Sequence, residues 1–107
     1  MKRKHKYNAV KTVVDGITFP SKAEARRYSE LKLLERGGVI QDIELQPQFI
    51  CTVNGKLVCK YVADFQYAKG NNEIVEDVKG VKTPVYRLKK KLVEALYGIT
   101  ITEIGGK

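Results

Sequence analysis

Two aspartates and a lysine stand on neighbouring stretches in which polar and apolar residues alternate. Asp64 lies on the first stretch, and Asp77 and Lys79 lie on the second. Alternate side chains of a β-strand point to the same face, so Asp77 and Lys79 share one face. A hairpin centred on Gly70–Asn71 would place Asp64 directly opposite Asp77, with β-carbons about 4.5–5.5 Å apart.

Two carboxylates at that separation repel each other unless a cation neutralises them. Hard divalent ions such as Mg²⁺ prefer oxygen ligands and keep water molecules that a phosphate or a nucleophile can replace. Lys79 could stabilise charge on a transferring phosphoryl group or orient the attacking water. The alternative is a pair of surface acids in an edge hairpin. The depletion of Asp in strands argues against this alternative. A register slip of one residue would favour it, because the two acids would then be separated.

The chain before this pair predicts a hairpin and then a helix. Asp15–Gly16 between two apolar stretches, 10–14 and 17–19, is typical of a hairpin turn. Ser21 followed three residues later by Glu24 is a capping box, which predicts a helix from about Lys22 to Arg36. The apolar stripe expected on this helix consists of Ala25, Tyr28, Leu31 and either Leu34 or Glu35.

Further strands and a second helix complete the order of elements. The expected strands cover 40–45, 49–53, 57–67, 74–79 and 99–104. Thr83 as cap with Pro84 at the first helical position predicts a helix that Gly98 closes. The apolar stripe expected on this second helix consists of Val85, Leu88, Leu92 and Leu96.

Two cysteines flank Asn54–Gly55, the preferred centre of a two-residue hairpin turn. A hairpin centred there pairs Cys51 with Val58, so that Cys51 and Cys59 point to opposite faces and form no disulfide. Two cysteines and the distant His5 also make no zinc site. We therefore expect both cysteines to act as small apolar residues in a reducing compartment.

Composition indicates one folded domain with a polyanionic partner. The chain has 107 residues, of which 43% are hydrophobic and 30% are charged, and its net charge is +8. A positive field of this size favours nucleic acid, although solubility alone would also explain it. The basic stretch 1–8 is expected to be a mobile tail. It lacks the apolar segment of a secretory signal, and no stretch is long enough to span a membrane, so a cytoplasmic location is expected.

Asp64, followed on the next strand by Asp77-Val78-Lys79, resembles the signature of the PD-(D/E)XK nucleases in its Asp-x-Lys form. Ala63 stands where the motif name has proline, a position that varies widely. The restriction-endonuclease-like core of that superfamily is helix, three-stranded antiparallel meander, helix, strand, and residues 21–104 follow this order. The resemblance implies a mixed α/β (α+β) fold with an added N-terminal β-hairpin, over 1–107 as a single nuclease-like domain.

Longer stretches are similar to one small branch of that superfamily. Residues 6–8, 19–28, 75–80 and 82–86 look like the phage-encoded domain-of-unknown-function 1064 family. The resemblance implies a phage-derived protein that works in the cytoplasm of the host cell.

The resemblance also assigns roles by position. Asp64, Asp77, the backbone carbonyl of Val78 and Glu24 would hold Mg²⁺ or Mn²⁺, and Lys79 would be the catalytic lysine. Glu24 has an equally weighted alternative role as the capping residue of the first helix. Asp64, Asp77, Lys79 and Glu24 are thus the expected catalytic set. The sequence contains no fingerprint of an organic cofactor.

Other polar residues have weaker assignments. Glu76 should point away from the site, because it alternates with Asp77. Gln46 could line the site, although a polar residue beside a turn is the simpler interpretation. Tyr86 could stack on an unpaired base or pack in the core. The residues expected to contact nucleic acid are Lys82, Tyr86, Arg87, Lys90, Lys91, Lys4 and Lys6; the alternative is a solvated helix face.

The expected function is metal-dependent hydrolysis of DNA phosphodiester bonds. A small domain has little area for sequence readout. Selectivity for branched or single-stranded DNA is therefore expected by analogy, as in a Holliday junction resolvase, and a homodimer would suit paired cuts. The alternative is a non-catalytic, basic nucleic-acid-binding accessory module of the same fold. A role on RNA is a third, weaker hypothesis.

Overall fold

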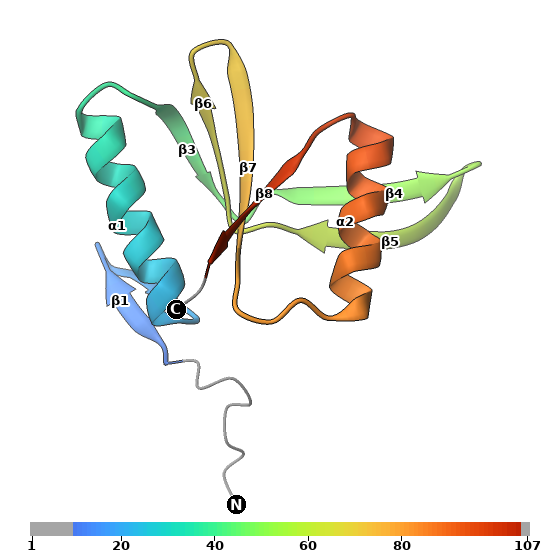
Figure 1. The fold of residues 1–107 in the computed structure, drawn as a ribbon, viewed down its shortest axis with the longest axis horizontal. Helices are drawn as coiled ribbons and strands as arrows, with labels where there is room; N and C mark the ends of the chain where they lie inside the picture. Colours follow the sequence, from blue (N-terminus) through green and yellow to red (C-terminus); the bar gives the residue numbers. More distant parts are fainter. Residues whose placement is uncertain (1–9, 106–107) are drawn as a thin grey trace, which may run out of the picture.

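A computed structural model describes residues 10–105 of the chain (Figure 1). The predicted basic tail, with Lys4, Lys6 and His5, lies outside the described residues. Neither helix in the described part has the length and apolar character that crossing a membrane would require.

The described chain forms a mixed α+β fold with an N-terminal antiparallel hairpin, as the sequence predicted. The elements are β1 (Thr12–Val14), β2 (Ile17–Phe19), α1 (Lys22–Arg36), β3 (Gln41–Leu45), β4 (Gln48–Val53), β5 (Lys56–Val62), β6 (Phe65–Lys69), β7 (Asn72–Lys79), α2 (Pro84–Tyr97) and β8 (Ile101–Gly105). The central sheet has the order β3-β6-β7-β8, antiparallel except for the parallel pair β7–β8. The meander β3-β6-β7 is interrupted by the separate hairpin β4–β5.

The two sides of the central sheet bury different clusters. One cluster includes Phe19, Tyr28 and Leu31 and joins the N-terminal hairpin and α1 to the sheet. The other includes Tyr61 and Val93 and joins the β4–β5 hairpin and α2 to the sheet. Figure 1 shows the two helices separated by the central strands. Successive residues of β7 therefore face different helices.

Both helices begin and end where their caps predicted. The Ser21 hydroxyl accepts a hydrogen bond from the Glu24 amide at 3.1 Å, and the Thr83 hydroxyl accepts one from the Tyr86 amide at 3.1 Å. Gly98 closes α2 with a φ of 67°, which lies in the left-handed region that glycine tolerates best.

The apolar stripe of α1 is confirmed, whereas that of α2 is largely wrong. Val85 and Leu88 are 63% and 69% exposed, and Leu96 is exposed as well. The buried residues of α2 are Tyr86 and Val93, and only Leu92 of the predicted stripe is partly buried. The helix therefore turns Tyr86 and Val93 inward, rather than the predicted stripe, and Tyr86 contacts Lys79 of β7 and Glu103 of β8.

The prediction that the two cysteines face opposite ways is also wrong. Cys51 and Cys59 are directly paired across β4 and β5, and both are free thiols. The register shifts between Cys51 and Thr52. A β-bulge adds one residue to one strand and thereby inverts the alternation beyond it, so the turn alone could not fix the pairing of the cysteines.

The predicted single strand over 57–67 is two strands with a bend between them. Ala63 donates its amide to the Pro47 carbonyl, whereas the next residue, Asp64, donates to the Glu76 carbonyl, both at 3.0 Å. The chain thus leaves the β4–β5 hairpin and enters the central sheet at this point. The bend resets which side chains share a face.

Candidate active site

The predicted register between the two acid-bearing strands is confirmed. β6 and β7 pair antiparallel with Phe65 opposite Glu76, as the hairpin predicted. Asp64 comes directly before β6, and its carboxyl interacts with that of Asp77. The Asp64 carboxylate also accepts a hydrogen bond from the Val78 amide at 2.7 Å. Hydrogen bonds to the backbone of β7 therefore hold Asp64 just before β6, beside the end of β7.

Asp77 is buried, with 2% of its surface exposed, and Tyr61 and Lys79 contact it in addition to Asp64. Its Oδ2 atom accepts a hydrogen bond from the Tyr61 hydroxyl, and its Oδ1 atom lies 3.5 Å from the Lys79 Nζ atom. The alternation had placed Tyr61 on the face opposite Asp64. The bend between β5 and β6 brings it to Asp77 instead, so Tyr61 is a site residue that the sequence interpretation missed.

Glu24 contacts both the cap of α1 and the acid pair. Its amide is capped by Ser21, and the Ser21 hydroxyl also lies 3.5 Å from the Glu24 Oε1 atom. Its side chain is at the same time a hydrogen-bond partner of the Asp64 carboxyl. Asp64 also interacts with Asp77 and so lies between the other two acids.

Burial dominates the electrostatics of these acids. Burial, and after it the neighbouring Glu24 carboxyl, raise the pKa of Asp64 to about 7. Burial also raises the pKa of Asp77 to about 6, with Tyr61 opposing that rise and the charge of Asp64 adding to it. Both acids therefore keep their protons to a higher pH than an exposed aspartate does.

The donor set fits a hard divalent cation in its chemistry, because α1, β7 and the segment before β6 each supply a carboxylate. As the side chains stand, no three His, Cys, Asp or Glu groups within residues 10–105 surround a common point suited to an ion. The acids contact one another in pairs instead. Carboxyls are expected to take this arrangement when they share protons that a bound ion would displace.

A pocket of about 130 Å³ opens beside these acids. The N-terminal hairpin, the start of α1 and the end of β3 line it, and Glu24, Gln46 and Asp64 are its polar wall. Gln46 has a φ of 51°, and its amide donates to the Asp64 carbonyl at 3.0 Å. The structure thus places Gln46 in the lining of a pocket that touches two of the candidate ligands.

Lys79 contacts the aromatic ring of Tyr86 as well as Asp77. Its Nζ atom lies 4.4 Å from the centre of the Tyr86 ring. The Tyr86 hydroxyl donates to Glu103 at 2.7 Å, and the ring is only 6% exposed. Of the two interpretations of Tyr86, packing in the core is the one that the structure supports. A side chain this buried cannot stack on a base, so Tyr86 does not belong to the nucleic-acid-binding residues.

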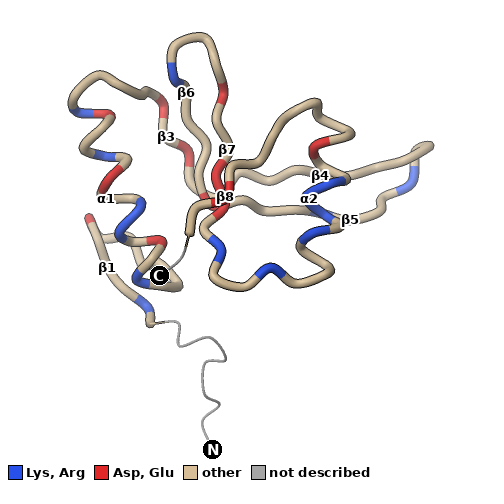
Figure 2. Tube along the Cα trace, viewed as in Figure 1, with Lys and Arg blue, Asp and Glu red and all other residues tan. Residues whose placement is uncertain are grey.

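The other basic residues of this region are spread along α2 and the segment before it (Figure 2). Arg87 and Lys91 are exposed. Lys82 pairs with Glu103 at 3.0 Å, and Lys90 pairs with Glu94 at 3.2 Å. We call the set Lys82, Arg87, Lys90 and Lys91 the α2 basic surface.

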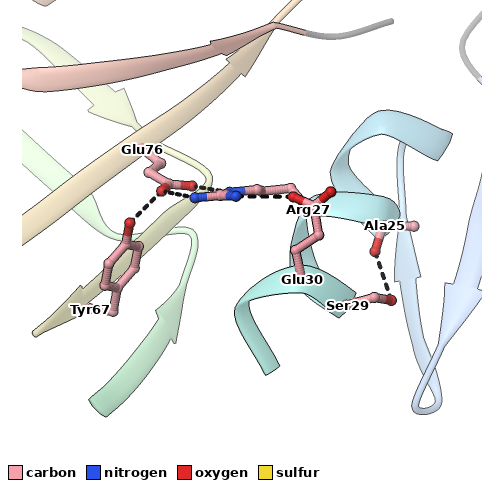
Figure 3. A network of polar contacts seen from close by, with 6 residues as sticks. All are labelled: Ala25, Arg27, Ser29, Glu30, Tyr67 and Glu76. Atoms are coloured by element: carbon pink, nitrogen blue, oxygen red, sulfur yellow. Dashed lines mark hydrogen bonds and ion pairs between the residues drawn. The ribbon is translucent and has the colours of Figure 1, made fainter. Parts of the chain in front are cut away.

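Glu76 points away from Asp77, as the alternation predicted. It lies on the α1 side of β7, is 1% exposed, and contacts Arg27 and Tyr67 (Figure 3). Its burial and its partner from α1 were not predicted, since Arg27 and Glu76 are 49 residues apart in the chain.

Fold and site together define a small mixed α+β domain with three neighbouring acids and a lysine where α1 meets the β6–β7 pair. The sequence profile of the family described as "Protein of unknown function (DUF1064)" matches residues 4–103, and the chain belongs to this family. No curated protein and no solved structure matches the chain.

Proposed function

We propose that this protein is a metal-dependent endonuclease of the PD-(D/E)XK superfamily, which hydrolyses DNA phosphodiester bonds with Mg²⁺ or Mn²⁺. The contact between the Asp64 and Asp77 carboxyls, with Glu24 beside Asp64 and Lys79 beside Asp77, carries the proposal. A buried Asp77 beside a half-buried Asp64 is a costly arrangement in a purely structural role, because the two carboxylates repel each other. They are the groups that a nuclease needs for its ion.

Different residues would bind the ion, orient a ligand and contact the phosphate. Asp64, Asp77 and Glu24 would hold the ion, with the Val78 carbonyl as a further ligand. A bound Mg²⁺ or Mn²⁺ ion lowers the pKa of a water molecule and stabilises charge on the phosphoryl oxygens. Tyr61 keeps the Asp77 carboxylate in one orientation through its hydrogen bond. Lys79 would leave Asp77 and donate to a phosphate oxygen, where charge develops during the reaction.

The substrate would be bound through its phosphates. The α2 basic surface follows Lys79 in the chain and would contact the DNA backbone. The pocket beside Glu24, Gln46 and Asp64 would receive part of the strand at the cleavage point. By analogy, we propose selectivity for branched or single-stranded DNA, as in a phage Holliday junction resolvase acting as a homodimer in the host cytoplasm.

Cleavage of a panel of end-labelled substrates tests the proposal. The panel contains a four-way junction, a flap, single-stranded DNA, duplex DNA and a matched RNA, each with Mg²⁺, Mn²⁺ or EDTA. We expect Asp77→Asn and Lys79→Ala to bind DNA but to cut at least about 100-fold more slowly than wild type. Glu73→Gln and Lys69→Ala, which change exposed residues at the β6–β7 turn, are the matched controls. Absence of cleavage of every substrate with either metal would contradict the proposal.

The second candidate is a non-catalytic, basic module that binds nucleic acid. The net charge of +8 and the lack of a preformed ion site in the described residues favour it. It predicts salt-sensitive binding of DNA that needs no divalent ion. Titration of Mn²⁺ by calorimetry separates the two candidates, because only the nuclease should release heat that Asp77→Asn abolishes.

A further inference from the structure

A buried ion pair joins α1 to β7 on the side of the sheet opposite Asp77. The Arg27 guanidinium donates from Nε to Oε1 of Glu76 at 2.9 Å and from Nη2 to Oε2 at 2.7 Å (Figure 3). The Tyr67 hydroxyl donates to the same Oε2 atom. Two parallel bonds between planar groups fix orientation as well as distance. Arg27 is 21% exposed and Glu76 is 1% exposed, so water competes little for this contact.

Each end of the ion pair lies next to a candidate metal ligand. On α1, Arg27 follows Glu24 by three residues, so the two side chains lie on neighbouring parts of one helix face. On β7, Glu76 immediately precedes Asp77, and its carbonyl accepts the Asp64 amide at 3.0 Å. The contact therefore connects the segments that carry all three acids.

Stability alone does not explain why charged groups occupy this place. The surrounding cluster of Tyr28, Leu31, Phe65 and partly buried Val78 already packs α1 against the sheet. Buried ion pairs can often be replaced by apolar residues of similar volume without loss of stability. Apolar packing, however, lets a helix slide by fractions of an ångström, whereas a bidentate contact does not.

We propose that Arg27 and Glu76 are positioning residues, which hold α1 on β7 so that Glu24 reaches the ion beside Asp64 and Asp77. The proposal rests on the proposed function, since it concerns the same metal site. Neither residue touches the ion, and Glu76 acts through the backbone of its own strand. The pair thus links the helix that carries Glu24 to the strand that carries Asp77.

A double variant separates positioning from stability. Arg27→Met with Glu76→Leu replaces the ion pair by apolar side chains. We expect its denaturant midpoint to stay close to that of wild type, while its Mn²⁺ affinity, measured by calorimetry, falls at least about tenfold. Arg27→Lys retains the charge but loses the bidentate contact and should weaken Mn²⁺ binding as well. Lys32→Met with Glu35→Leu, which removes the ion pair at 2.8 Å on the outer side of the same helix, is the matched control.

Hydrogen exchange at the Asp64 amide gives a readout that needs no metal. Exchange should be faster in the double variant than in the control, because this amide is bonded to the Glu76 carbonyl. Unchanged Mn²⁺ affinity in a stable double variant would overturn the positioning role and leave the nuclease intact. A loss of affinity that only parallels a loss of stability would overturn it too. Wild-type protein that binds no Mn²⁺ would instead refute the proposed function, and the positioning role with it.

Discussion

The two oxygens of Asp77 are divided between the Tyr61 hydroxyl and the Lys79 ammonium. Tyr61 lowers the pKa of Asp77 against the effect of burial, because its hydroxyl bonds to the charged form. Tyr61→Phe should therefore raise the pKa of Asp77 above its present value of about 6. Titration of the Asp77 carboxyl carbon by NMR in metal-free protein measures the change. Tyr97→Phe, which removes an exposed hydroxyl bonded to the Ile50 carbonyl, should leave that pKa unchanged.

The raised pKa values of Asp64 and Asp77 make metal-free protein more stable in mild acid than in base. The folded-state pKa of Asp64 is about 7 and that of Asp77 is about 6, both above the ordinary value of 3.8. Folding therefore favours the protonated acids, and this contribution to stability is lost as the pH rises through 6 and 7. The pKa of Glu103 is lowered, so this residue titrates below the same window.

Thermal unfolding in EDTA should accordingly give a lower melting temperature at pH 8 than at pH 5. Mg²⁺ should reduce the difference in melting temperature between the two pH values. An ion that binds only the native state stabilises it most at the pH at which the acids are charged. Asp64→Asn should reduce the dependence of the melting temperature on pH. Glu73→Gln, which changes an exposed acid, should not. A melting temperature that rises from pH 5 to pH 8 in EDTA would contradict the assignment of raised pKa values.

At the scale of residues, the sequence predicted that Asp64 and Asp77 lie close together, but not which side chains contact the buried acids. Turn residues and alternation were enough to predict the register of β6 with β7, and with it the proximity of Asp64 and Asp77, because both effects are local. Tyr61 was placed on the opposite face, since the bend at Ala63 depends on where β4 and β7 lie. Contacts between residues 49 apart, such as Arg27 and Glu76, leave no periodic trace in the sequence.

At the scale of elements, the first turn of α1 serves as both a helix cap and a wall of the site. Ser21→Ala should remove the cap and lower the free energy of unfolding by about 1 kcal/mol, with little change in Mn²⁺ affinity. Glu24→Gln keeps the backbone cap and should instead weaken Mn²⁺ binding, with a smaller effect on stability. Denaturant titration and calorimetry on both variants measure the two effects. Equal losses of stability and of metal affinity in both variants would show that Glu24 is only a capping residue.

The elements themselves were predictable to the extent that their signals are local. Capping residues fixed both ends of each helix, because hydrogen bonds within four residues decide them. The buried face of α2 was not predictable, since Tyr86 and Val93 on one side compete with Val85 and Leu88 on the other. Which side is buried depends on the strands beneath the helix. The faces to which the two cysteines point were not predictable either, since they depend on a β-bulge.

At the scale of the molecule, the excess positive charge is unevenly neutralised. Lys82 and Lys90 have acidic partners in Glu103 and Glu94, whereas Arg87 lies exposed and contacts the Lys82 carbonyl at 3.2 Å. A cation that already has a partner releases fewer counterions when it meets a phosphate. We therefore expect Arg87 and Lys91, rather than the whole α2 basic surface, to dominate the salt dependence of DNA binding.

Fluorescence anisotropy of a labelled junction in EDTA tests this ranking over a range of salt concentrations. Each phosphate contact should contribute about 0.9 to the slope of log affinity against log salt. Arg87→Ala with Lys91→Ala should therefore lower the slope by about 2, and Lys82→Ala with Lys90→Ala by less. Lys56→Ala with Lys69→Ala, at the tips of the two hairpins, should leave the slope unchanged. If all three double variants lower the slope equally, the protein binds DNA through its overall charge, and α2 does not face the substrate.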